Sequence, residues 1–133
     1  MRTAVGVALF LLIAPGLYAQ SGENVLIVAS DKIPGSVQVA ERYAKARHVP
    51  GDQILRLNAP AAEEITHAAF DRDIQAPIAK WLASSARQDR ILYIVLTHGI
   101  PLRISGTPGR NGTVASVDSE LTLLYRRMTG IAV

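Results

Sequence analysis

Three short apolar runs, separated by two longer segments with helical periodicity, constrain the fold of this sequence more than any other feature. The runs are residues 24–30, 53–57 and 91–97, and the first and third are apolar almost throughout. Continuous apolar runs of this length are typical of strands that are covered on both faces. Helices that connect such strands make right-handed crossovers, so this order predicts a parallel sheet between two layers of helices.

Each connecting segment has one apolar face. In the first segment, residues 37–47, that face consists of Val37, Ala40 and Ala44. In the second segment it consists of Phe70, Ile74, Ile78, Trp81 and Leu82. Thr66 is expected to cap the second helix, because its hydroxyl can accept a hydrogen bond from a backbone N–H of the first turn. Pro77 interrupts the apolar stripe and predicts a kink or a late restart of the helix there, since proline lacks the N–H that a helix interior needs.

The last third of the chain is predicted to contain a turn and one more helix. Asn111-Gly112 suits a two-residue hairpin turn, and Ser116 is expected to cap a helix over residues 117–127. The predicted fold class is therefore α/β, a three-layer sandwich with a mainly parallel sheet, in the order βαβαβ followed by a helix. We expect residues 20–133 to form a single α/β domain whose sheet is incomplete.

The N-terminus is predicted to be a secretory signal peptide, residues 1–19. Met1-Arg2 is followed by the apolar run Ala4–Ala14, and cleavage is expected after Ala19. The run has 11 residues, whereas a membrane-spanning helix needs about 20, although a retained membrane anchor is the alternative. We therefore expect export to the periplasm or the cell exterior. Because the sequence contains no cysteine, the exported domain must be stabilised by its core rather than by disulfides.

Composition and charge exclude several classes of function. The formal net charge is only +3, and no run of like charge exceeds two residues, so we predict no nucleic-acid partner. The glycines of residues 107–113 lack the glycine–lysine–serine/threonine ending of a phosphate-binding loop. We also predict no cofactor, no metal site and no transmembrane segment in the mature chain. Its partners stay open at this point.

The best candidate for chemistry is the tip of the third apolar run, Thr97-His98-Gly99. In parallel α/β sheets, ligands bind beyond the carboxyl ends of the strands, and Ser30-Asp31 and Asn58 are expected at the same edge. A histidine can act there as a general acid or base, because its ordinary pKa lies near neutrality. The glycine after it allows a sharp turn and leaves a substrate room to approach. The alternative is that His98 only caps the end of a strand.

Four further residues are candidates for binding. Asp31, Asp118 and Glu120 could act as acid and base or hold a cation, and Arg103 could hold an anionic group at the sheet edge. Each also has a purely structural interpretation. Asp31 suits a turn, Asp118 and Glu120 suit the first turn of a helix through its dipole, and Arg103 suits a solvated surface.

The His98-Gly99 pair resembles the His-Gly element of the caspase and gingipain class of cysteine peptidases. In that class the pair follows one strand of an α/β sheet, and the nucleophilic cysteine follows the next strand. The resemblance implies that this chain is the N-terminal half of a gingipain-like hydrolase with His98-Gly99 at the edge of its active site. The nucleophile would have to be encoded beyond Val133, since the printed sequence has no cysteine.

A second resemblance covers about residues 23–133. The segments ENVLIVAS, VAERYAKARHVP, QDRILYIVLTHGIPLRI and GTVASVDSELTLLY resemble an uncharacterised family of exported bacterial proteins, with Ser116–Leu121 carrying the match best. Members of that family run on past this point, which implies that residues 20–133 are the N-terminal part of a longer domain. Because the family has no assigned reaction, an exported domain of unknown activity and a hydrolase both stay open.

Overall fold

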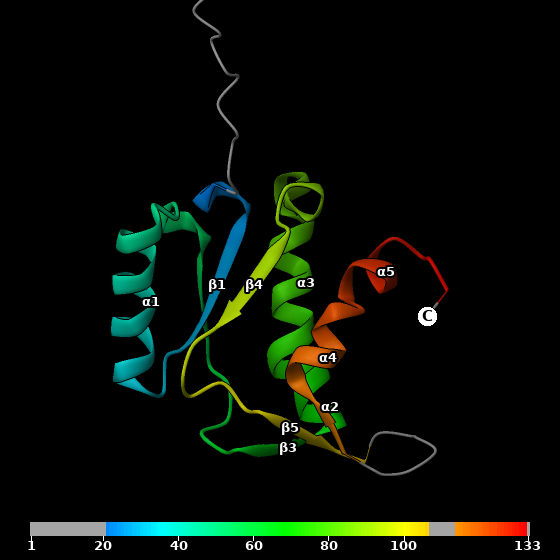
Figure 1. Cartoon of the computed structure of the whole chain (residues 1–133). Helices are drawn as coiled ribbons and strands as arrows, with labels where there is room; N and C mark the ends of the chain where they lie inside the picture. The colour runs from blue at the N-terminus through cyan, green and yellow to red at the C-terminus, as the bar shows by residue number, and fades with distance from the viewer. Residues whose placement is uncertain (1–20, 107–113, 133) are drawn as a thin grey trace, which may run out of the picture.

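The computed structural model of the protein describes residues 21–106 and 114–132, which form two small sheets and their helices (Figure 1). The main sheet is parallel throughout and has the strand order β2-β1-β4. Its strands are β1 (Val25–Ser30), β2 (Ile54–Leu57) and β4 (Tyr93–Leu96). The predicted α/β class with a mainly parallel sheet is therefore confirmed, and the three apolar runs of the sequence are its strands.

Helices cover both faces of the main sheet (Figure 1). One face carries α1 (Pro34–Arg47), and the other carries α2 (His67–Phe70), α3 (Ala76–Ala83), α4 (Val117–Thr122) and α5 (Leu124–Met128). Short 3-10 turns join the elements: η1 (Gly22–Asn24), η2 (Gly51–Gln53) and η4 (Ser84–Asp89). Among these described helices, none is both long and apolar enough to span a bilayer.

The central strand β1 supplies both halves of the core, because successive side chains along a strand point to opposite faces. Ile27 and Ala29 pack against Ala40 and Ala44 of α1. Leu26 and Val28 belong to the larger cluster on the other face, which includes the predicted stripe of the second helical segment. The apolar periodicity of both helices is therefore explained by the two faces of one buried strand.

Of the two outcomes predicted for Pro77, a kink or a restart of the helix, the structure shows the restart, because α3 begins at Ala76. The chain passes from α2 through one turn of π-helix, η3 (Asp71–Gln75), into α3, and the proline lies in the first turn of α3. A π turn uses i→i+5 hydrogen bonds, and it occurs mostly as a single turn inside an α-helix, as it does here. The expected cap is confirmed, since the Thr66 hydroxyl accepts from the Ala69 N–H at 3.2 Å.

The second sheet was not predicted. Its strands are β3 (Glu64–Thr66), β5 (Arg103–Ser105) and β6 (Val114–Ser116), in the order β3-β5-β6. The β3–β5 pair is parallel and the β5–β6 pair is antiparallel. This sheet lies near the carboxyl ends of the main strands (Figure 1), and buried Ile65 and Ile104 join it to the larger core.

The helix predicted over residues 117–127 is interrupted. It divides into α4 and α5 at Leu123, although the Ser116 hydroxyl caps α4 as expected by accepting from the Ser119 N–H at 3.1 Å. The predicted Asn111-Gly112 turn and the predicted signal peptide lie outside the described residues.

Candidate functional site

A pocket of about 570 Å3 opens at the carboxyl end of the main sheet. Most of its wall is apolar and is formed by Ile33, Ala61, Ala62, Leu96, Ile100 and Leu102. Three of the candidate residues, His98, Gly99 and Asp118, line it together with Glu63. The structure therefore brings the tip of β4 and the first turn of α4 to one site, at the edge where parallel sheets bind ligands.

His98 is exposed at the rim of this pocket. Its ring lies beside the start of α1, where a Cβ built on Gly35 would be 3.7 Å from His98 Cε1. Within residues 21–106 and 114–132, no hydrogen bond occupies either ring nitrogen of His98. Both nitrogens are thus available to a bound molecule, as a general acid or base requires.

Gly99 has a structural role that accounts for the glycine without any substrate. Its φ of +92° lies in a region that residues with a side chain rarely adopt. A Cβ at this position would also lie 2.8 Å from Ile33 Cγ1. The turn after His98 therefore needs glycine both for its backbone conformation and for its close approach to Ile33.

A chain of buried hydroxyl groups lies beneath the His98 turn and fixes the ends of β1, α1 and β4 to one another. The Ser30 N–H donates to Ser36 Oγ at 2.8 Å, Ser36 Oγ lies 2.7 Å from Thr97 Oγ1, and Thr97 Oγ1 donates to the Val28 carbonyl at 3.1 Å. Because the Thr97 hydrogen is used on Val28, the Ser36 hydroxyl must be the donor to Thr97. Both hydroxyls are therefore committed to the fold rather than available as nucleophiles.

The other three candidates do not meet in the pocket, and each forms an ion pair. Asp31 accepts a hydrogen bond at 2.6 Å from Arg56 of β2, and neither residue lines the pocket. Arg103 lies 3.3 Å from Glu63.

Glu120 accepts from Arg127 at 2.6 Å, and this pair joins α4 to α5. These contacts support the structural interpretations of Asp31, Arg103 and Glu120. Asp118 differs from them, because it is exposed and has no hydrogen bond or ion pair with another described residue.

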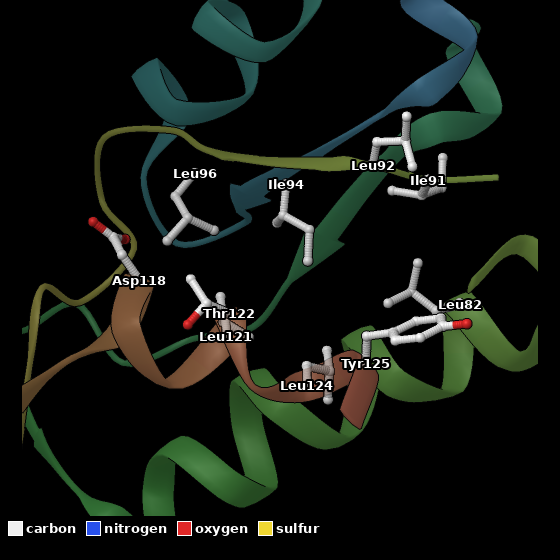
Figure 2. Close-up of a pocket in the computed structure, with 10 residues that line it drawn as sticks. All are labelled: Leu82, Ile91, Leu92, Ile94, Leu96, Asp118, Leu121, Thr122, Leu124 and Tyr125. Atoms are coloured by element: carbon white, nitrogen blue, oxygen red, sulfur yellow. The ribbon is translucent and has the colours of Figure 1, made fainter. Parts of the chain in front are cut away.

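A second, groove-shaped cavity of about 550 Å3 was not predicted from the sequence (Figure 2). It lies between β4 and α4–α5, and it shares Leu96 and Asp118 with the first pocket. At its other end the Tyr125 hydroxyl donates to Asp89 at 3.1 Å. That hydrogen bond, and then the charge of the carboxylate, raises the pKa of Tyr125 above its ordinary value, so the phenol stays neutral.

Glu63 and the hydroxyl chain were also missed. Glu63 lies in a loop with no pattern of its own, and Ser36 and Thr97 are 61 residues apart in the sequence. In the described part of the chain, no group of three or more His, Cys, Asp or Glu side chains is placed to hold a metal ion. Comparison of the chain with protein-family models, with curated proteins and with solved structures finds no match.

Proposed function

We propose that this chain is a ligand-binding α/β domain of an exported bacterial protein, and that the ligand binds in the pocket at the carboxyl end of the main sheet. The observation that carries the proposal is the pocket itself, about 570 Å3 in volume, with an apolar wall and the polar groups of His98 and Asp118 on it. Small-molecule sites are typically cavities of this size, with mainly apolar walls and a few polar groups that orient the ligand.

The pocket chemistry favours an uncharged or cationic ligand with an apolar body. His98 offers two ring nitrogens, and Asp118 offers a carboxylate without a partner in the described residues. Glu63 adds a second carboxylate, although Arg103 lies 3.3 Å from it. A ligand carrying an amine or amide could therefore donate hydrogen bonds to the rim while its apolar part covers the wall.

The test is a binding screen on the full chain with a panel of drug-sized apolar amines and amides, followed by backbone amide NMR. Ligands are expected to shift the signals of residues 96–100 and to lose at least about tenfold in affinity with Ala62→Phe, which narrows the pocket. Ala83→Phe is the matched control, because Ala83 is also exposed but lies at the end of α3, outside the pocket. Ligands that bind both variants equally would show that the pocket is not the site.

A second candidate function, hydrolysis, is favoured by the exposed ring of His98 at the rim of the same pocket, which has no hydrogen bond to any described residue. Since Ser36 and Thr97 are committed to each other, the attacking group would be water. His98 would take a proton from the water as its oxygen bonds to the carbonyl carbon. The histidine would then return the proton to the leaving group as the scissile bond breaks.

This second candidate predicts that His98→Gln lowers the turnover of an activated ester by at least about 100-fold, which is the usual contribution of a general base. Binding of a pocket ligand should change by no more than about twofold, because glutamine preserves a polar group of similar reach. Unchanged turnover in His98→Gln would remove the hydrolase candidate and leave the binding domain.

A further inference from the structure

The outer edge of β4 has no partner strand in the part of the chain that the structure describes. In the strand order β2-β1-β4, no other described strand pairs with β4 on its far side. The Thr97 N–H donates to Val28 of β1 at 3.0 Å, in the register that pairs Leu96 with Val28. Because backbone groups alternate in direction along a strand, Ile94 and Leu96 direct their N–H and C=O groups to the open edge.

The groove of Figure 2 runs along this edge on the face that carries α3 and α4. Ile94 and Leu96 form its wall on the sheet, and Leu121 and Leu124 form its wall on the helices. In Figure 1, α4 and α3 lie on the same side of the main sheet, opposite α1. One side of the groove is thus formed by the unpaired edge of β4, and the other side is formed by apolar side chains of α4 and α5.

The rim of the groove exposes large apolar side chains. Leu92 is 65% exposed and Tyr125 is 46% exposed, and both line the groove. Proteins usually protect a free edge with charged residues or proline, but no charged residue or proline occurs between Ile91 and Thr97. This edge therefore lacks two of the features, charged residues and proline, that keep another strand from pairing with it.

Charge distinguishes the two ends of the groove. Asp118 lies at the end near Leu96 (Figure 2), and it is the one charged residue among those that line the groove. It has no hydrogen bond or ion pair with any residue the structure describes. A strand in the groove would be complementary if it were apolar along its length and carried a lysine or arginine at the Asp118 end.

We propose that this groove binds an extended polypeptide segment of a partner protein as a fourth strand of the main sheet. The segment pairs through its backbone with Ile94 and Leu96, places alternate apolar side chains between β4 and α4–α5, and presents a basic residue to Asp118. Strand addition of this kind takes its affinity from main-chain hydrogen bonds and its specificity from alternate side chains.

A second copy of this chain fits the groove less well than a single strand does. Antiparallel two-fold pairing of β4 with β4 would bring both α4–α5 segments to the same face of the joint sheet. A lone strand brings no such helices. The inference also differs from the proposed small-molecule site, with which it shares only Leu96 and Asp118.

The test titrates the full chain with two labelled peptides, acetyl-Thr-Val-Thr-Val-Thr-Val-Thr-Lys-amide and the reversed sequence, in both of which the lysine lies on the same face of the strand as the valines, and measures fluorescence anisotropy. One orientation is expected to bind and to place lysine at Asp118. Two N-methylated forms of that peptide, each blocking one alternate set of amides, give the decisive comparison. One form should lose at least about tenfold in affinity and the other little, because only one set of amides faces β4.

Protein variants locate the peptide. Leu92→Lys should weaken binding by about tenfold, and Asp118→Asn by about fivefold, the effect of one exposed ion pair. Val39→Lys is the matched control, because Val39 is also a half-exposed apolar residue but lies on α1, and it should bind as the unaltered chain does.

Three outcomes would overturn the proposal. They are no binding of either peptide, equal binding of both N-methylated forms, and self-association that Leu92→Lys abolishes in sedimentation while no peptide binds. The last outcome would assign the edge to a second copy. None of them affects the pocket proposal, which is tested separately with Ala62→Phe.

Discussion

Phe70→Ala is expected to lower the free energy of unfolding by about 3–5 kcal/mol. Phe70 is fully buried at the end of α2, in the cluster that fills the space between β1 and the helices of that face. The change removes a large apolar side chain and leaves a cavity that a close-packed core cannot refill. Because a domain of this size has a total stability of about 5–15 kcal/mol, urea denaturation should show a much lower midpoint or no folded baseline.

Two controls make this result specific. Phe70→Leu should lower the free energy of unfolding by less than about half the effect of Phe70→Ala, because leucine retains most of the buried volume. Val39→Ala, on the exposed face of α1, should stay within about 0.5 kcal/mol of the unaltered chain. A Phe70→Ala chain that is as stable as Val39→Ala would contradict the packing of α2 against the sheet.

Gly99→Ala is expected to lower the free energy of unfolding by about 2–6 kcal/mol, from two causes that can be separated. The φ of +92° is unfavourable for any residue with a Cβ, at about 1–3 kcal/mol. The new Cβ would also lie 2.8 Å from Ile33 Cγ1 and 3.0 Å from Ile33 Cβ. Overpacking of this kind typically lowers the stability further, by about 1–3 kcal/mol. Thermal or urea unfolding of the purified variant measures the sum.

Gly130→Ala separates the two causes. Gly130 also has a positive φ, +72°, but a Cβ there would meet nothing within 4 Å, so its loss of stability should reflect the backbone alone. Ile33→Ala combined with Gly99→Ala should restore part of the stability relative to the sum of the single changes. Strict additivity of those two changes would show that the contact with Ile33 is not the reason for glycine.

The parts of the fold that could be predicted are those in which one short segment carries its own pattern. The run Val25–Ser30 is buried on both faces, so its composition alone identifies a central strand. The two caps, Thr66 and Ser116, depend on bonds to residues three positions away. In each case the interaction that decides the structure is local, or it repeats with a regular period.

The second sheet could not be predicted for the opposite reason. β3 and β5 have three residues each and only one buried apolar side chain, Ile65 or Ile104. Such a strand forms because a partner 39 positions away pairs with it, as in the match of Ile65 with Ile104. The same limit applies to the site: the sequence placed His98 at the sheet edge, but only the tertiary fold places Asp118 in the same pocket.

The π turn between α2 and α3 affects which side chains of this helical segment face the sheet. Phe70, Ile74, Ile78 and Leu82 are spaced by four residues, and all four are buried in one cluster. In an unbroken α-helix each step of four overshoots a full turn by about 40°, so the three steps would rotate Leu82 about 120° away from Phe70. The wider turn at Asp71–Gln75 absorbs part of that rotation. The extra residue in this turn thus reduces the rotation between successive apolar side chains. As a result, side chains spaced by four residues stay directed at the same face of the sheet.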